Sequence, residues 1–320
     1  MNQRGLCIAL VALVAASSPA VGAYPERPVR VIVPFSPGGT ADFVGRIVGE
    51  ALSNELKQQM VVDNRGGAGS VVGTQLAARA TPDGYTLIVN NIGLAVNETL
   101  RPDRGYVALK ALAPISLVGF TPSVLVVNKD SPFNSVSDWI AAAKKQPGKI
   151  SFGSAGAGSS THLSMSYLES VAHIKLLHVP YKGGGPAVAA MIGGEVNCVL
   201  APIPTVFALI KAGRLRALAS TSAKRASTLP DLPTIAEAGV PGYEFNTWYG
   251  LLTTAGTPKT IIDRLNAAAR KALATPDITG KLQKAGLDPQ PTSTDGFRRL
   301  IQSEIEKWRK VINEAGITIR

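Results

Sequence analysis

The sequence predicts an α/β protein with largely parallel sheets, divided into two domains. Short β-branched runs alternate along the chain with longer segments of helical periodicity, and glycine-rich turns join several of them. Alternation of this kind is typical of parallel sheets covered by helices. At roughly 100–200 residues per domain, a length of 320 residues suggests two domains.

The first predicted unit is a strand, a turn and a helix. The strand is Val29–Val33, the turn runs through residues 34–40, and the apolar positions Phe43, Val44 and Ile47 begin the buried face of a helix. The same order recurs after further predicted strands at residues 60–63, 86–90, 150–153, 176–179, 195–200 and 215–221. In such sheets, ligands bind outside the carboxyl ends of the strands, where these turns lie.

Two longer strand-like stretches, residues 117–128 and 244–254, are candidates for connections that cross between the domains. If both cross, one lobe comprises residues 24–124 together with 247–320, and the other comprises residues 125–246. The remaining stretch, residues 258–315, has helical periodicity throughout, with apolar stripes that should face a sheet.

Residues 1–23 have the pattern of a secretory signal peptide. Arg4 supplies a positive charge, residues 6–16 are apolar, and small residues precede Tyr24. An apolar run this short does not span a bilayer, which needs about 20 residues. We therefore expect a soluble protein in the periplasm.

Composition excludes several classes of function. Two Cys and three His in the whole chain leave too few ligands for a multi-cysteine zinc site, a disulfide framework or an iron–sulfur cluster. The lone cysteine after residue 23, Cys198, lies in an apolar strand and is expected to act as a small hydrophobe. The formal net charge of +11 is scattered without a basic stripe. We therefore expect no metal, no cofactor and no nucleic-acid partner, and interpret the charge as a solvated surface or as mild steering of anions.

Three glycine-rich loops carry the chemistry that the sequence supports. They span residues 36–42, 154–161 and 183–186, each before a predicted helix whose free N–H groups would attract an anion. Thr40 or Asp42 is a candidate cap of the first helix, and Pro186 is a candidate first residue of the third. A single loop of this kind is also explained by steric needs alone. Three loops in one chain favour an anion-binding cleft.

Catalytic motifs are absent from the sequence. There is no phosphate-binding loop and no nucleophile elbow, and the glycine spacing around residues 153–158 does not fit a dinucleotide fingerprint. Asp42 is a conceivable general base, although capping its own helix is the simpler role. His162 either contacts a ligand or serves in packing and capping. We expect no enzymatic activity.

Several motifs resemble a known family. They are the segment 24–30, the turn Pro34-Phe35-Ser36-Pro37-Gly38-Gly39-Thr40-Ala41-Asp42, and the segments 64–69, 82–87, 179–183, 215–219 and 232–239. Together they resemble the substrate-binding proteins of tripartite tricarboxylate transporters, the Bug receptors, over essentially the whole chain after residue 23. The resemblance implies a type II-like periplasmic binding protein fold. Two α/β lobes, joined by two crossing connections, would close on a small carboxylate and deliver it to membrane transporter subunits.

The resemblance also implies a ligand-binding set drawn from both lobes, with the carboxylate between the first glycine loop and the serine-rich loop. The expected residues are Phe35, Ser36, Gly38, Gly39, Thr40, Asp42, Asn91, Ser154, Ala155, Gly156, Gly158, Ser159, Ser160, His162, Tyr181, Lys182, Ala201 and Pro202.

The chain departs from the family pattern at residues 200–204, where an acidic residue is common among relatives and Leu-Ala-Pro-Ile-Pro stands here. This departure favours a dicarboxylate or an aromatic carboxylate over an amino acid. We expect a monomer. A ligand-sensing receptor for a signalling partner and a periplasmic α/β enzyme are the alternative functions.

Overall fold

The computed structural model describes residues 24–319. The predicted signal peptide, residues 1–23, lies outside the described residues. Within 24–319, no helix combines the length and the apolar character that a membrane crossing requires. The α/β class is confirmed, as strands and helices alternate along most of the chain.

Lobe 1 is built on three parallel strands. β1 (Val29–Val33) pairs in parallel with β2 (Met60–Asn64) on one side and with β3 (Thr86–Asn91) on the other. β9 (Asn246–Thr254) then pairs antiparallel with β3, and β4 (Leu112–Asn128) pairs antiparallel with β9. β1 and β3 are largely buried because helices cover both of their faces, whereas β2, at the edge of the sheet, is more exposed.

Lobe 2 repeats the arrangement. β5 (Ser151–Ser154) pairs in parallel with β6 (Leu177–Pro180) and with β7 (Cys198–Pro202). β4 pairs antiparallel with β7 and with β8 (Leu215–Ser220). The prediction of parallel strands therefore holds for β1–β3 and β5–β7, whereas the strands that join or flank them are antiparallel.

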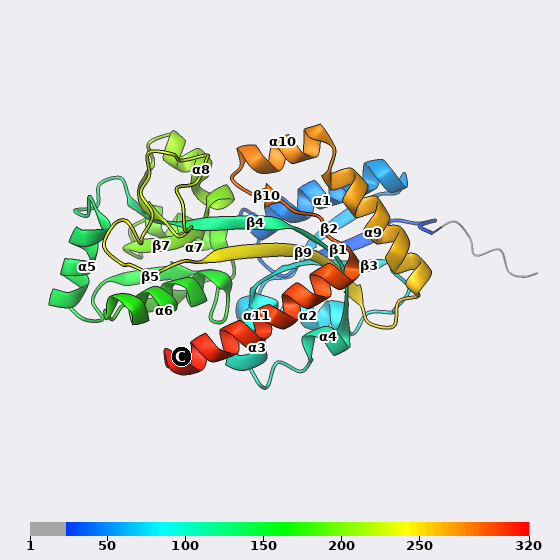
Figure 1. The fold of residues 1–320 in the computed structure, drawn as a ribbon, viewed down its shortest axis with the longest axis horizontal. Coiled ribbons are helices and arrows are strands. Elements are labelled where there is room, and N and C mark those ends of the chain that lie inside the picture. Colours follow the sequence, from blue (N-terminus) through cyan, green and yellow to red (C-terminus); the bar gives the residue numbers. More distant parts are fainter. Residues whose placement is uncertain (1–23, 320) are drawn as a thin grey trace, which may run out of the picture.

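The chain crosses between the lobes twice (Figure 1). The first crossing lies within β4, and the second lies at the start of β9. β4 pairs with β9 as far as Pro122 and with β7 from Ser123 onward. On the return, Phe245 donates its N–H to the Thr221 carbonyl of lobe 2 at 2.8 Å, and the next residue, Asn246, already pairs with Pro122. The predicted lobe limits at residues 124 and 247 stay a prediction, close to these changes of partner.

Helices cover both halves of the sheet (Figure 1). Those of lobe 1 are α1 (Thr40–Leu56), α2 (Val71–Ala78), α3 (Gly93–Leu100), α4 (Ala108–Ala111), α9 (Lys259–Leu273) and α10 (Pro276–Lys284), with a short 3-10 turn η1 (Ala68–Ser70). Those of lobe 2 are α5 (Val136–Lys145), α6 (Ser160–Ala172), α7 (Gly184–Ile192) and α8 (Ile203–Lys211).

The last helix, α11 (Thr294–Glu314), packs against both lobes. Near its start, Phe297 packs edge-to-face on Trp248 of β9, with ring centroids 5.5 Å apart. Near its end, Trp308 contacts the rings of Tyr167 and Phe245, at 6.0 and 5.2 Å. This single amphipathic helix therefore holds the crossing strand β9 and the base of lobe 2 in one apolar core.

Three expectations about local structure were wrong. The stretch 258–315 is not helical throughout, because Pro289 cannot continue a helix. A short strand, β10 (Asp288–Pro289), interrupts it and pairs antiparallel with β4. The strand predicted from residue 195 begins at Cys198, since the preceding residues form the turn that ends α7. Pro186 is the third residue of α7 and not the first.

The packing of α11 on β9 predicts a strong effect of a single methyl group. A Cβ added at Gly250 would lie 2.0 Å from Cζ of Phe297, which is fully buried. We expect Gly250→Ala to lower the free energy of unfolding by about 1–3 kcal/mol, the usual cost of overpacking a core. Urea denaturation followed by tryptophan fluorescence measures this change.

Gly280→Ala is the matched control. Gly280 lies inside α10, and no neighbouring atom lies within 4 Å of an added Cβ. This substitution should raise the free energy of unfolding by about 0.5–1 kcal/mol through helix propensity. Equal stability of Gly250→Ala and the parent protein would contradict the close packing of α11 on β9.

Candidate functional site

A small pocket lies between the two lobes at the carboxyl ends of the parallel strands. Lobe 1 contributes Phe35, Gly39, Thr40, Ala41, Asn91 and Tyr249, and lobe 2 contributes Ala155, Ser160, Thr161, Gly184, Pro202 and Thr205. The pocket has a volume of about 20 Å³, room for about one water molecule. The cleft is therefore closed in this structure.

The first turns of four helices meet at this pocket. α1 follows β1, and α6, α7 and α8 follow β5, β6 and β7 in the same way. Within residues 24–319, the backbone N–H groups of Ala41, Ser160, Thr161 and Gly184 have no hydrogen-bond partner. Among the described residues, no Lys, Arg, Asp or Glu lines the pocket. Helix N-termini without competing charges form an anion-binding site built from backbone donors.

The serine-rich loop, residues 154–159, uses most of its own N–H groups internally. Ala155 donates to Oγ1 of Thr161 at 2.8 Å, and Gly156 donates to Oγ of Ser154 at 3.1 Å. Gly158 donates to Nδ1 of His162 at 3.3 Å. These bonds fix the loop shape, so that the donors left for a ligand are those of the first turn of α6.

Ser159 is the N-cap of α6, because its hydroxyl accepts the N–H of His162 at 3.3 Å. Of the predicted serine-loop residues, Ala155 and Ser160 line the pocket. Ser154, Gly156, Gly158, Ser159 and His162 lie behind its wall and are buried.

The first glycine loop is closed on itself in a similar way. The predicted capping of α1 by Thr40 or Asp42 was wrong: the N-cap is Gly39, and no side chain caps the helix. Asp42 instead accepts the N–H of Gly38 at 3.1 Å and forms an ion pair with Arg46 at 3.0 Å. Its negative charge is thus compensated, and Gly38 is exposed outside the pocket.

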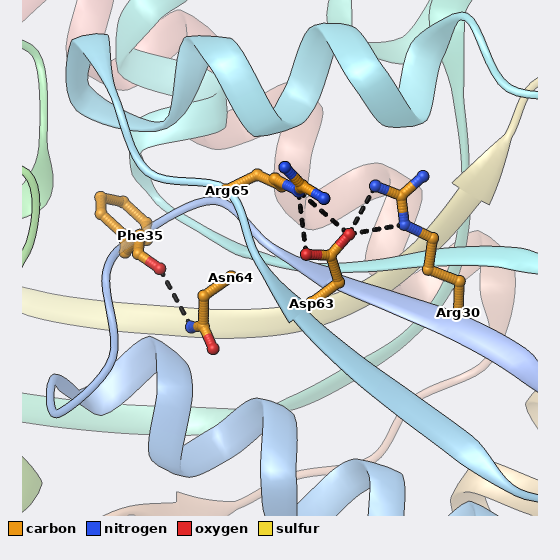
Figure 2. Close-up of polar contacts among 5 residues, drawn as sticks. All are labelled: Arg30, Phe35, Asp63, Asn64 and Arg65. Atoms are coloured by element: carbon orange, nitrogen blue, oxygen red, sulfur yellow. Dashed lines mark hydrogen bonds and ion pairs between the residues drawn. The ribbon is translucent and has the colours of Figure 1, made fainter.

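The end of β2 holds this loop in place (Figure 2). Nδ2 of Asn64 donates to the carbonyl of Phe35 at 3.0 Å. Beside it, Asp63 bonds Nε of Arg30 at 2.8 Å and Nε of Arg65 at 2.9 Å. Burial raises the pKa of Asp63, but hydrogen bonds and charges from the two arginines outweigh burial and hold that pKa below its ordinary value. The carboxylate therefore stays ionised at neutral pH and anchors both arginines.

Tyr249 is a wall residue that sequence reasoning missed. It lies opposite Asn91 in the antiparallel pairing of β3 and β9, so both side chains stand at the pocket. Burial raises the pKa of Tyr249 above its ordinary value, and hydrogen bonding to Asn91 and Thr40 offsets only part of this rise. The phenol is thus neutral and part of a polar wall. The position of Tyr249 at the pocket follows from the pairing register of β3 and β9, which are distant in sequence, and no local sequence pattern indicates it.

Direct hydrogen bonds join the lobes around the pocket. Thr205 of α8 accepts the N–H of Thr40 at 2.9 Å, and the two hydroxyls lie 2.7 Å apart. Ser36 donates its N–H to the carbonyl of Lys182 at 3.1 Å. Arg101 donates to the carbonyl of Ala157 at 3.1 Å. Thr205 therefore belongs to the pocket wall and to the contact that closes it.

Three other predicted residues lie away from the pocket. The hydroxyl of Tyr181 bonds Glu195 at 3.2 Å, and the side chain of Lys182 is exposed. Ala201 is buried in the core of lobe 2. Its neighbour Pro202 does line the pocket. The residues that the structure brings together at the pocket from the predicted set are Phe35, Gly39, Thr40, Asn91, Ala155, Ser160 and Pro202.

Metal-ligand clusters and the cysteine were two further features to place among the described residues. Within 24–319, no cluster of three His, Cys, Asp or Glu side chains is arranged to hold a metal ion. Cys198 is a free thiol, fully buried, and burial raises its pKa. The interpretation of Cys198 as a small hydrophobe agrees with this environment.

Curated relatives match nearly the full chain. The UPF0065 protein in the tcbD-tcbE intergenic region of Pseudomonas sp. (strain P51) is 41% identical over 293 residues, which cover 91% of this chain and 87% of that protein. Protein BugT of Bordetella pertussis is 36% identical over 299 residues, with coverage of 93% and 92%.

Solved structures of similar proteins also match nearly the full chain. The adipate complex of Rpa4515 from R. palustris superposes with a TM-score of 0.89 at 35% identity, covering 92% of this chain and 99% of that one. The malate complex of MatC from Rhodopseudomonas palustris gives 0.87 at 31% identity, covering 90% and 100%. A TctC solute-binding protein from Polaromonas, solved with no ligand, gives 0.63 at 27% identity, covering 91% and 99%.

The family model for the tripartite tricarboxylate transporter family receptor matches residues 44–317. The fold predicted from the resemblance, that of periplasmic binding proteins, is confirmed, because the structure superposes on the periplasmic binding protein BugD with a TM-score of 0.89 at 33% identity, covering 93% of this chain and 100% of that one. The chain belongs to the tripartite tricarboxylate transporter receptor family, the family of TctC and the Bug proteins.

Proposed function

We propose that this protein binds a small carboxylate in the periplasm, between its two lobes, and delivers it to a tripartite tricarboxylate-type membrane transporter. The observation that carries the proposal is that four helix N-termini meet at one pocket. Among the described residues that line this pocket, none has a charged side chain. Unpaired N–H groups of both lobes would bind the same carboxylate. Such a ligand favours the closed state because it contacts both walls only there.

The comparison with relatives supports a closed cleft. The relatives solved with adipate and with malate superpose at TM-scores of 0.89 and 0.87, whereas the relative solved with no ligand reaches 0.63. Coverage is similar in all three cases, so a different placement of the lobes is the simplest reason for the lower value. The pocket volume of about 20 Å³ agrees with a cleft that must open to admit its ligand.

The charges around the pocket favour a simple carboxylate over an amino acid. An ammonium group would need an acidic partner, and Asp42, the acidic residue of the first loop, is already paired with Arg46. We therefore infer a dicarboxylate or an aromatic carboxylate as the ligand. Adipate and malate in relatives are consistent with the first class.

A charge placed at the start of α6 tests the site. Ser160 lines the pocket and is the first residue of the helix. Ser160→Asp should abolish carboxylate binding in calorimetry because it puts a negative charge where the ligand charge would lie. The fold should tolerate the change, since an acidic residue in a first turn stabilises a helix by about 0.3–1 kcal/mol. Ser160→Asn is the matched control without charge, and unchanged binding by Ser160→Asp would contradict the site.

A thermal-shift screen tests the ligand class. Adipate, malate, benzoate and a panel of amino acids should be compared at one concentration and one pH. We expect at least one simple carboxylate to raise the melting temperature, since binding at 100 times Kd stabilises the folded state by about 2.7 kcal/mol. Stabilisation by amino acids alone would contradict the proposed class.

The contact between Thr40 and Thr205 predicts a contribution of the closed lobes to affinity. Thr205→Val keeps the shape but leaves the N–H and hydroxyl of Thr40 without their partner, only when the cleft is closed. A loss of about 1.4 kcal/mol, typical of an unsatisfied buried donor, would weaken ligand binding about tenfold in calorimetry. Thr205→Ser, which retains the hydroxyl, should bind like the parent. Identical affinity of the Val and Ser variants would show that this contact does not stabilise closure.

A further inference from the structure

A stack of three aromatic rings lies behind the serine-rich loop. Phe152 and His178 are paired neighbours on the parallel strands β5 and β6, with ring centroids 4.8 Å apart. His162, in the first turn of α6, stacks on His178 at 4.2 Å. His162 is 3% exposed, so the two imidazoles form a largely buried pair beneath the ligand-facing turn.

Each imidazole holds one part of the loop. Nδ1 of His162 accepts the N–H of Gly158 at 3.3 Å. Nε2 of His178 lies 2.6 Å from Oγ of Ser154, and that hydroxyl accepts the N–H of Gly156. A nitrogen that accepts a hydrogen bond must carry a lone pair, which fixes the proton of His162 on Nε2. Protonation of Nδ1 would remove this acceptor and repel the Gly158 N–H.

The surroundings oppose protonation of both rings. Burial, the neighbouring His178 and the Arg101 guanidinium lower the pKa of His162 to about 3. Burial lowers the pKa of His178 to about 4. Among residues 24–319, no carboxylate forms an ion pair with either ring. Both imidazoles are therefore neutral at pH 7.

Arg101 links this pair to the closure of the lobes. It extends from the end of α3 in lobe 1 and donates to the carbonyl of Ala157, in the middle of the loop. Opening of the cleft would withdraw the guanidinium charge and part of the burial from His162. Proton binding to His162 is thus weaker in the closed state than in the open state, and by linkage acid favours the open state.

We propose that His162 and His178 are positioning residues of the serine-rich loop, and that His162 holds the loop in its ligand-binding form only while its ring is uncharged, so that ligand affinity falls on acidification. The inference rests on the proposed function, because the loop supports one wall of the proposed carboxylate site. The pH window follows from the sign of the shifts. Both forms of the cleft are folded, so the pKa of His162 in the open form lies between its closed-form value of about 3 and the ordinary value of about 6.5, and affinity falls as the pH drops through that range.

The test uses a double variant that keeps the hydrogen-bond acceptors and removes the titration. His162→Asn places an amide oxygen near the position of Nδ1, and His178→Gln places an amide near the position of Nε2. His173→Gln is the matched control. His173 ends the same helix, is exposed, and contacts neither ring of the stack.

The first measurement needs no ligand. The ¹⁵N-labelled parent and the His173→Gln control should show amide resonances of Gly156 and Gly158 that move between pH 7 and pH 4.5. In the double variant these resonances should stay in place over the same range. Resonances that are equally constant in the parent, or that move equally in the double variant, would overturn the inference whatever the ligand is.

The second measurement is the affinity for adipate between pH 7.5 and pH 5. Because parent and variant meet the same ligand, protonation of adipate cancels in the comparison. The parent should lose about three- to tenfold more affinity than the double variant over this range. Identical pH profiles would overturn the coupling to binding. A lack of adipate binding by the parent at pH 7.5 would count against the proposed ligand class, and the resonances of Gly156 and Gly158 would still decide the inference about the imidazoles.

Discussion

Close approach of backbone to backbone across the cleft is the constraint on which the rest of the site depends. A Cβ at Gly69 of lobe 1 would lie 2.3 Å from the carbonyl oxygen of Ala157 in lobe 2. A Cβ at Gly185 of lobe 2 would lie 2.8 Å from the carbonyl oxygen of Pro37 in lobe 1. Without side chains at these positions, loops of the two lobes meet directly, and their helix N-termini reach one small pocket. The glycines therefore serve the contact between the lobes.

Two crossing strands and one helix fix the positions of the two lobes that make this contact. β4 and β9 cross from one lobe to the other, and α11 packs Phe297 on β9 and Trp308 on residues of lobe 2. β9 also carries Tyr249, which forms part of the pocket wall. Any movement of the crossing strands therefore also moves the pocket wall.

Much of the fold could be predicted from local patterns, because β-branched runs and helical periodicity report on burial directly. β1 was predicted to the residue, and most other strand limits were displaced by up to three residues, whereas β4 begins at Leu112, well before its predicted start at residue 117. The antiparallel strand β10 was missed, since two residues between helices carry no periodic signal. Pairing between strands far apart in sequence, such as Asn91 with Tyr249, is decided by packing of the whole sheet and leaves no local trace.

The candidate site was predicted as three loops, and seven of the predicted residues line the pocket. Sequence alone determined the types of group available: glycine and hydroxyl residues after strands, two cysteines, three histidines and few charges. The tertiary structure decided which backbone N–H groups of these residues remain unpaired. Gly158 donates to His162 and Gly38 donates to Asp42, whereas Ser160 and Gly184 keep unpaired N–H groups at the pocket. Each backbone group finds its partner in three dimensions, and a sequence does not state which partner that will be.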